Sequence, residues 1–498
     1  MNPFDIWIIN ELIKKKVLSS SEEVQTVIWF PSTPYEKYSC AIRLKNQPQT
    51  KNDINSGIFT KLDCVGNYIN LIIEKQDLIS QVFKILELYD NKTQLIITSD
   101  VVVEHTSLTP VYPINLATFR SSVIGNALVS IYREQGANVS THYFVADTAR
   151  NVDLVLKKYS IDNLLAFRGT GKNDHTCGVM FCESLKNIGK LSGNIDFKKM
   201  FPYSSNILTP SNIDREYGVN DARAYCDFCL QGHIETLEKA NIIIDFFDYE
   251  SDIVQAKNNN MLELNTISQE NINNTYLFNN CLYYSTLSKN NCTVFSVISY
   301  RQNAIIKKAI SFLKNKICVF PVFFNDVLIK KHNQIFTDVI NEGIFHSVDK
   351  YIDDATHILN INSSEAIEAL KLLFLSMKNG DIIQLNCESF SDLKKYSDIL
   401  FFIKNTIDEI EQTKEISNQD IYLAKRLIII FNECLFEGVI KNPQKPDLDI
   451  FTLVSHIKNI VQYINNNFYL QKFPINQKIL MSTKKILFKV LHLLGIEI

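Results

Sequence analysis

The chain has 498 residues, and its 51 Lys and Arg against 54 Asp and Glu give a formal net charge of −3. This near balance excludes a global field that would recruit nucleic acid or a membrane surface. Hydrophobic residues make up 46% and charged residues 21%, which excludes wholesale disorder. The length predicts roughly two to four domains.

The N-terminus lacks the basic and then apolar layout of a signal peptide. No apolar run approaches the length of a membrane span, so we expect a cytoplasmic protein with no membrane partner. The 11 cysteines are an odd number, and a chain of this length buries a core without a disulfide framework. We therefore expect buried free thiols.

The first predicted domain covers residues 1–90 and mixes two periodicities. Residues 6–15 and 76–89 repeat apolar side chains with helical spacing, whereas 39–46 and 66–74 alternate like strands. This mixture predicts a small α+β domain.

The second predicted domain covers residues 91–360. A β-branched run at 94–107 is typical of a buried strand, a helical pattern follows at 120–136, and 138–146 again predicts a strand. Strand, loop, helix and strand make the βαβ unit of a parallel sheet. Further strands are expected at 240–247, 291–300 and 317–324, so we predict a doubly wound α/β domain.

The third predicted domain covers residues 361–498, where the pattern becomes helical. Helical patterns occur at 365–377, 397–411, 421–436, 451–464 and 482–495. Consecutive helices of this kind predict an all-α bundle.

Five segments, in order along the chain, resemble one known family, and one of them is 275–277, which resembles the Y-L that opens its Y-L-T-R-D. Residues 103–128, VEHTSLTPVYPINLATFRSSVIGNAL, resemble the signature region of arginyl-tRNA synthetases, V-E-x-S-S-x-N-P-x-x-P-L-H-V-G-H-x-R-S-x-x-I-G-N-A-L, without a gap. Residues 145–151 resemble the family's V-N-D-x-G-x-Q, 226–251 resemble the stretch leading to F-D-x-x-x-x-E-S, and 490–498 resemble its closing helix. The resemblance implies a class I synthetase Rossmann-like domain with an insertion, a small N-terminal α+β domain and a C-terminal all-α anticodon-binding-like domain.

The first nucleotide motif of the family is altered in this chain. A class I synthetase joins the amino-acid carboxylate to the α-phosphate of ATP, and the histidines of its H-x-G-H motif stabilise the developing charge. Asn115 and Thr118 replace those histidines, and Ala117 replaces the glycine that lets adenine lie close to the backbone. Asn115 and Thr118 are also good helix-capping types, and Arg120 fits a role in helix packing. Since one lost donor costs roughly a hundred- to a thousandfold in rate, the changes indicate loss of nucleotide activation.

The second nucleotide motif is missing as well. Residues 343–349 fit the position that follows the family's lysine-rich loop, but the preceding segment 338–342 carries Asp338 and Glu342. These carboxylates would repel ATP. Lys330 and Lys331 compensate only if the loop is rebuilt.

The amino-acid pocket of the family is half kept. The resemblance assigns it to Glu104, Thr109, Tyr276, Asn280 and Gln302. Glu104, Tyr276 and Gln302 match the family. Thr109 replaces an asparagine, and Asn280 replaces the aspartate that pairs with the guanidinium of arginine. This change predicts weakened arginine binding or a less cationic ligand. The alternative roles are capping for Glu104 and packing for Tyr276 and Gln302.

A metal site is the less favoured interpretation of one cysteine pattern. Cys226 and Cys229 lie one helical turn apart, and His175, Cys177 and Cys182 precede them in the insertion. Such residues can bind zinc, but no second close cysteine pair accompanies them. We expect buried thiols and no metal.

These observations predict a degenerate arginyl-tRNA synthetase-like protein that does not charge tRNA and keeps a binding role. Its partner would be tRNA, another protein or a small amino-acid-like ligand. Lys484, Lys485 and Lys489 are the candidate tRNA contacts, with a solvated helix face as the alternative. Two enzymatic alternatives stay open: a synthetase-fold enzyme for a different substrate, and a working arginine–tRNA ligase. Only these would need ATP and magnesium.

Overall fold

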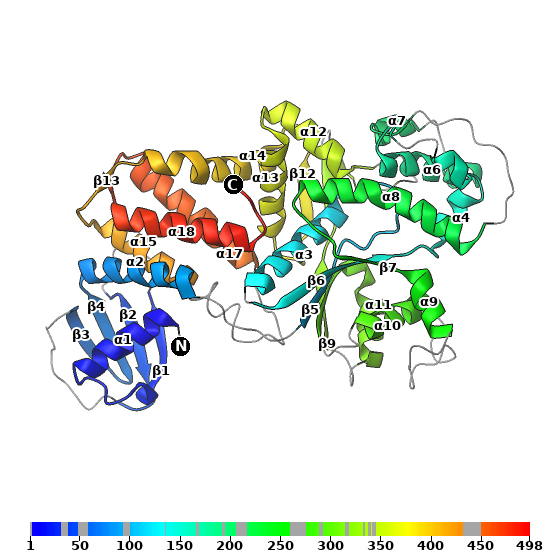
Figure 1. The fold of residues 1–498 in the computed structure, drawn as a ribbon. Coiled ribbons are helices and arrows are strands. Elements are labelled where there is room, and N and C mark those ends of the chain that lie inside the picture. Colours follow the sequence, from blue (N-terminus) through cyan, green and yellow to red (C-terminus); the bar gives the residue numbers. More distant parts are fainter. Residues whose placement is uncertain are drawn as a thin grey trace. The chain divides into compact units, whose positions relative to one another are not determined.

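The computed structural model of the chain describes residues 2–30, 38–47, 58–92, 100–134, 136–165, 169–191, 195–205, 217–258, 275–287, 292–313, 318–331, 334–336, 340, 345–431 and 450–498 (Figure 1). The chain forms two compact units. Unit 1 comprises Met1–Leu95, Asp398–His492 and Ile498, and unit 2 comprises Ile96–Ser397 and Leu493–Glu497. The domain boundaries expected after residues 90 and 360 stay predictions.

The N-terminal part of unit 1 is an antiparallel sheet with helices: α1 (Pro3–Lys14), η1 (Ser21–Glu23), β1 (Val24–Trp29), β2 (Cys40–Leu44), β3 (Phe59–Val65), β4 (Tyr68–Ile73) and α2 (Lys75–Lys92). The strand order is β1-β2-β4-β3. Ile69, Leu71 and Ile73 are buried while the residues between them are not, because alternate side chains of a strand point to opposite faces. The predicted helices and strands of this region are confirmed.

The C-terminal part of unit 1 is mostly helical: η5 (Phe402–Thr406), η6 (Ile407–Glu409), β13 (Gln412–Thr413), α15 (Asn418–Ile430), α17 (Ile450–Ile464), η8 (Asn465–Tyr469), β14 (Ile475–Asn476) and α18 (Gln477–Leu493). Helix α15 packs on α2 (Figure 1) and also contacts β1. The rings of Phe4 and Phe431 meet edge to face with centroids 5.4 Å apart, and Lys425 Nζ donates to the Tyr38 carbonyl at 2.9 Å. Segments from the two ends of the sequence therefore share one core.

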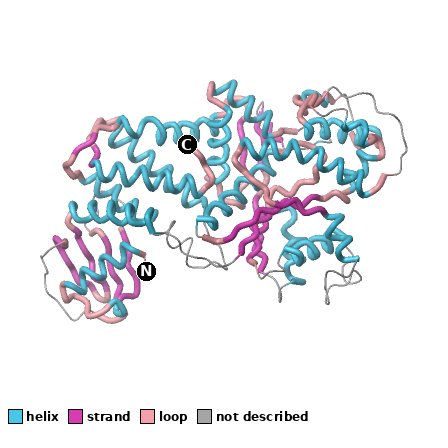
Figure 2. The backbone as a smooth tube through the Cα atoms, in the orientation of Figure 1, coloured by secondary structure: helices cyan, strands magenta, loops and turns pink. Residues whose placement is uncertain are grey.

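Unit 2 is built on a five-stranded sheet of order β7-β6-β5-β8-β9, in which every pairing is parallel. The strands are β5 (Asp100–Glu104), β6 (Asn138–Val145), β7 (Phe246–Tyr249), β8 (Thr293–Ser299) and β9 (Cys318–Phe324). Figure 2 shows these strands between two groups of helices. The α/β prediction is confirmed, and helix α3 (Leu116–Glu134) makes the expected crossover from β5 to β6.

One predicted strand is wrong in its extent. The run 240–247 was expected to be extended throughout, but β7 begins only at Phe246. Asn241 has a positive φ of 53°, and the Ile242 amide returns to the Leu237 carbonyl at 2.9 Å, which closes the preceding helix. The apolar residues there serve a helix terminus because local turn chemistry outweighs strand propensity.

Further elements complete unit 2. The insertion contains α4 (Arg150–Leu156), α5 (Ile161–Leu165), α6 (Asn173–Asn187), α7 (Phe197–Met200) and α8 (Val219–Lys239). The remaining elements are α9 (Glu250–Asn258), α10 (Thr275–Leu287), η3 (Tyr300–Gln302), α11 (Asn303–Leu313), β10 (Val327–Lys331), β11 (Gln334–Phe336), α12 (Val348–Leu359), α13 (Ser363–Leu375), β12 (Ile383–Asn386) and α14 (Ser391–Phe401), which begins in unit 2. Among the described residues of both units, no helix is long and apolar enough to cross a membrane.

Candidate functional site

A cavity of about 250 Å³ lies at the carboxyl edge of the parallel sheet, and we name it the sheet-edge cavity. Its walls come from the ends of β5, β8 and β9, from the first turns of α3 and from α10. Strand β5 pairs with β6 on one side and β8 on the other. The cavity therefore lies at the point where the strand order reverses, which is where open α/β sheets bind ligands.

The sheet-edge cavity brings together four of the five residues assigned to the amino-acid pocket. Glu104, Thr109, Asn280 and Gln302 all line it. Tyr276 lies in the first turn of α10, and its side chain is outside the described residues. Thr118 from the altered nucleotide motif lines the same cavity. The predicted pocket residues therefore share one site, and their roles there stay predictions.

Glu104 is the acidic group of the sheet-edge cavity. It ends β5 and is only 5% exposed. The hydroxyls of Ser107 and Ser296 each donate to one oxygen of its carboxyl group. Burial raises the pKa of Glu104, and the two hydroxyl bonds oppose that shift. The side chain is thus held in place by neutral donors.

A second layer of polar side chains supports this carboxyl group. Tyr284 Oη lies 3.0 Å from Ser296 Oγ. Tyr283 donates to Asp248 Oδ2 at 3.0 Å, and His142 Nδ1 lies 2.8 Å from the same oxygen. These residues were not predicted from the sequence. Helical spacing from Tyr276 and Asn280 to the two tyrosines was the available signal.

The first turn of α3 adjoins the sheet-edge cavity and is capped from within the chain. Asn115 Oδ1 accepts the Thr118 amide at 2.8 Å, as a helix N-cap does. The Thr118 carbonyl accepts the hydroxyls of Ser121 at 2.8 Å and Ser122 at 3.1 Å. Ala117 is half-buried. The capping contact expected of Asn115 is present, and it uses one of the helix-terminal donors.

Arg120 is fully buried and bonded to backbone. Its Nη1 donates to the carbonyls of Asn325 at 2.9 Å and Asp381 at 2.8 Å, and its Nη2 donates to Lys378 at 2.8 Å. Burial lowers the pKa of Arg120 to about 10. A Cβ on Gly125, further along α3, would meet the His105 ring at 2.4 Å, so this helix needs glycine for its close approach to the chain after β5. Arg120 and Gly125 therefore have structural roles in the packing of α3.

The remaining motif positions lie elsewhere. In the segment 338–342 only Ile340 belongs to the described residues, so Asp338 and Glu342 lie outside them. Lys330 is exposed on β10, which also contains Lys331. Lys484, Lys485 and Lys489 are half-buried on α18, and Lys484 Nζ pairs with Asp408 at 2.5 and 2.6 Å. Their contact with tRNA stays a prediction.

The cysteines of the insertion are buried thiols, as expected. Cys177, Cys182, Cys226 and Cys229 are free and buried, and burial raises the pKa of the thiols of Cys182, Cys226 and Cys229. Within the described ranges, no three His, Cys, Asp or Glu side chains are grouped to hold a metal ion.

Part of the chain is similar in sequence to known proteins. The chain is 25% identical over 206 residues to arginine–tRNA ligase from Archaeoglobus fulgidus, covering 41% of the chain and 35% of the relative. It is 28% identical over 215 residues to arginine–tRNA ligase from Methanococcus maripaludis, covering 41% and 36%. The aligned region thus spans about a third of each relative. No protein-family model matches the chain.

Solved structures of other proteins match the fold over the whole chain or nearly all of it. Arginyl-tRNA synthetase from Thermus thermophilus matches with a TM-score of 0.65 at 13% identity, covering 100% of this chain and 99% of the other. The enzyme from Plasmodium falciparum matches with a TM-score of 0.63 at 14% identity, covering 99% and 98%. The fold is that of a class I aminoacyl-tRNA synthetase. The chain shares this fold with the arginyl-tRNA synthetases, and about two fifths of its sequence is similar to arginine–tRNA ligases.

Proposed function

We propose that this arginyl-tRNA synthetase-like protein binds an amino-acid-like ligand in the sheet-edge cavity and neither couples that ligand to ATP nor charges tRNA. The first turn of α3 carries the proposal. Asn115 is engaged in capping, and Arg120 is engaged with three backbone carbonyls. Among the described residues that line the cavity, none is Lys, Arg or His. A polyphosphate needs such donors at the reacting end.

The lining favours a ligand with a positively charged group. Glu104 supplies a carboxyl group, whereas Asn280 and Gln302 supply neutral amides. The walls include Phe144, Tyr283 and other apolar groups that exclude water from the ligand's hydrocarbon part. An amino acid with a cationic or polar side chain fits this combination.

Transfer RNA is the partner that the family suggests. The sequence relatives are named arginine–tRNA ligases, and the match to the solved Thermus thermophilus synthetase covers 100% of this chain. We propose that tRNA binding, where retained, involves Lys485 and Lys489 on α18. A loss of tRNA affinity in a gel shift of the Lys485→Ala, Lys489→Ala double variant would support this contact. Unchanged affinity would refute it.

A working arginine–tRNA ligase is the second candidate, because the curated relatives carry that activity in their names. ATP–pyrophosphate exchange with purified chain, total tRNA and each of the twenty amino acids separates the candidates. We expect no exchange with any amino acid. Exchange with arginine establishes the ligase and overturns our interpretation of Asn115, Ala117 and Thr118. Exchange with another amino acid identifies an enzyme with a different substrate.

Calorimetric titration with arginine tests the cavity directly. Glu104→Gln removes the acidic group, so arginine affinity should fall by about tenfold or more. Asn280→Asp adds a carboxylate that accepts a guanidinium bidentately, so affinity should rise by about tenfold. Glu238→Gln, exposed on α8, is the matched control. Equal affinities in all four proteins would place arginine outside the sheet-edge cavity.

A further inference from the structure

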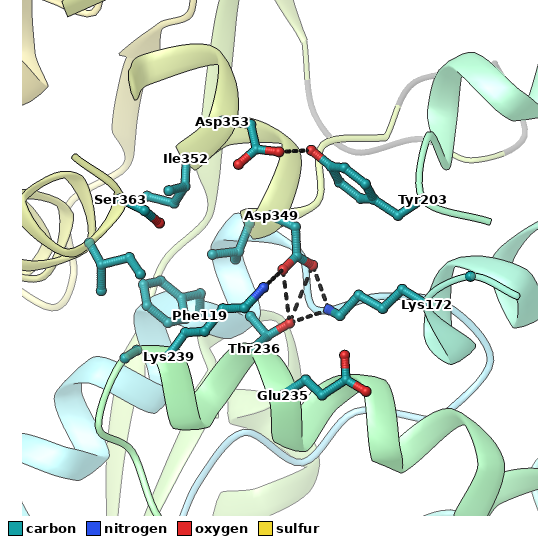
Figure 3. A pocket seen from close by; sticks show the side chains of 14 residues that line it. Phe119, Lys172, Tyr203, Glu235, Thr236, Lys239, Asp349, Ile352, Asp353 and Ser363 are labelled. Carbon is teal, nitrogen blue, oxygen red and sulfur yellow. Dashed lines mark hydrogen bonds and ion pairs between the residues drawn. The ribbon is translucent and has the colours of Figure 1, made fainter. Parts of the chain in front are cut away.

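A second cavity of about 330 Å³ lies among the helices of unit 2, and we name it the inter-helix cavity (Figure 3). Helices α3, α8, α12 and α13 contribute its walls. Phe119, Ile352 and Ile367 give it an apolar side. The two cavities have no lining residue in common. The volume is that of a pocket for a small molecule, since such sites typically measure about 300–1,000 Å³.

A buried ion-pair network forms the floor of the inter-helix cavity. Lys172 Nζ lies 2.6 Å from Asp349 Oδ2 and 3.2 Å from Asp174 Oδ2, and it also donates to the Thr236 hydroxyl. Burial would lower the pKa of Lys172, but the two aspartates outweigh burial and raise it. The three N–H groups of this lysine are therefore occupied, so it has no donor left for an anionic ligand.

The network is built into the packing of the insertion on α12. A Cβ on Gly232 would meet the Asp174 side chain at 2.4 Å, so α8 and α6 approach closely only because this residue is glycine. Burial opposes ionisation of Asp349, but its contacts with His175 and Lys172 hold its pKa below the usual range. Asp349 therefore stays ionised, and its charge is already matched.

The inter-helix cavity has more carboxylates than cationic side chains. Lys172 and Lys239 match Asp174 and Asp349, with Lys239 Nζ 3.9 Å from Asp349 Oδ1. Glu235 on α8 is exposed and forms no hydrogen bond or ion pair with another described residue. Among the described contacts, the carboxylate of Asp353 on α12 accepts only the Tyr203 hydroxyl, and Asp353 is exposed. Figure 3 shows Glu235 and Asp353 on opposite sides of the Asp349 network.

We propose that the inter-helix cavity binds a small alkyl dication, of the diamine or aminoalkyl-guanidine type. Its two charged ends face Glu235 and Asp353, and its hydrocarbon chain packs on Phe119, Ile352 and Ile367. Two unmatched carboxylates complement two positive charges, and the apolar side complements the chain between them. This ligand is separate from the one proposed for the sheet-edge cavity.

Titration calorimetry with 1,4-diaminobutane tests the site, with 1,4-butanediol and succinate as neutral and anionic probes of similar length. We expect binding of the diamine alone, weakening as salt rises. The double variant Glu235→Gln, Asp353→Asn should lose about tenfold or more in affinity, and Glu238→Gln, on the same exposed face of α8, should keep it. Absent diamine binding, equal succinate binding or an unaffected double variant would overturn the proposal.

Methyl resonances of isoleucine locate the bound diamine independently. Ile352 and Ile367 line the inter-helix cavity, whereas Ile298 and Ile306 line the sheet-edge cavity. The first pair should shift on titration while the second pair does not. The reverse pattern would place the diamine against Glu104 and refute this inference, while leaving the function proposed for the sheet-edge cavity intact.

Discussion

The two cavities of unit 2 hold their buried carboxyl groups in opposite ways. In the sheet-edge cavity, Glu104 accepts two serine hydroxyls, and burial raises its pKa. In the inter-helix cavity, Asp349 pairs with Lys172, and its pKa lies below the usual range. Neutral donors leave a carboxyl group available to a cationic ligand, whereas an ion pair commits it to the fold. The comparison separates a binding carboxyl group from a structural one, although both are buried.

The largest expected effect comes from removing the cation of the inter-helix cavity. Lys172→Met leaves Asp174 and Asp349 buried without their partner, and we expect a loss of about 3–5 kcal/mol in the free energy of unfolding. Urea unfolding measures it. Lys350→Met is the control, because the Lys350–Asp354 pair is half-exposed and should contribute less than about 1 kcal/mol. Equal effects of the two variants would contradict a structural role for the network.

Ser296→Ala should have a smaller effect in the sheet-edge cavity. It removes one of the two hydroxyls on Glu104, and an unsatisfied buried acceptor costs about 1–3 kcal/mol. The pKa of Glu104 should rise further, which nuclear magnetic resonance of the carboxyl carbon would detect. Ser299→Ala alters the same cavity without touching this carboxyl group. A matching pKa change in that control would contradict the assignment.

The pH dependence of stability should have opposite signs at the two carboxyl groups. Folded Glu104 has a pKa above 4.5, so the native state binds its proton more tightly and this contribution to stability is lost as pH rises through the folded pKa. Folded Asp349 has a pKa below 3.8, so its contribution is present above that value and is lost as pH falls through the folded pKa. One pKa unit corresponds to about 1.4 kcal/mol.

Unfolding curves between about pH 2 and pH 7 would test this difference in sign. The difference in free energy of unfolding between the parent chain and Asp349→Asn should become smaller as pH falls. The free energy of unfolding of Glu104→Gln should rise relative to that of the parent chain as pH rises. Parallel pH profiles for both variants would remove the distinction between the cavities.

The smallest effect is expected at the start of α3. Asn115→Ala removes the cap on the Thr118 amide, which should cost about 1 kcal/mol in thermal unfolding. Asn115→Asp keeps an acceptor oxygen and adds charge suited to a helix N-terminus, so stability should be retained. If Asn115→Ala leaves thermal stability unchanged but abolishes ligand binding, this side chain contacts the ligand instead of capping the helix.

Local pattern predicted much of the molecule. The β-branched run at 94–107, the helical spacing of 120–136 and the strand pattern of 138–146 predicted β5, α3 and β6. Asn115 was expected to cap a helix, and it does so. Four residues assigned by resemblance line one cavity. The same local reasoning failed at 240–245, where an apolar run closes α8 instead of extending β7.

The sequence by itself determined the helices and strands, because their periodicity depends on neighbours a few residues apart. Only the tertiary structure decided which side chains meet across the sheet and between helices. The parallel register sets Ser296 beside Glu104, 192 residues away, and the packing of α6 on α12 sets Lys172 against Asp349, 177 residues away. Such pairings follow from sheet register and helix packing, which no local periodicity encodes.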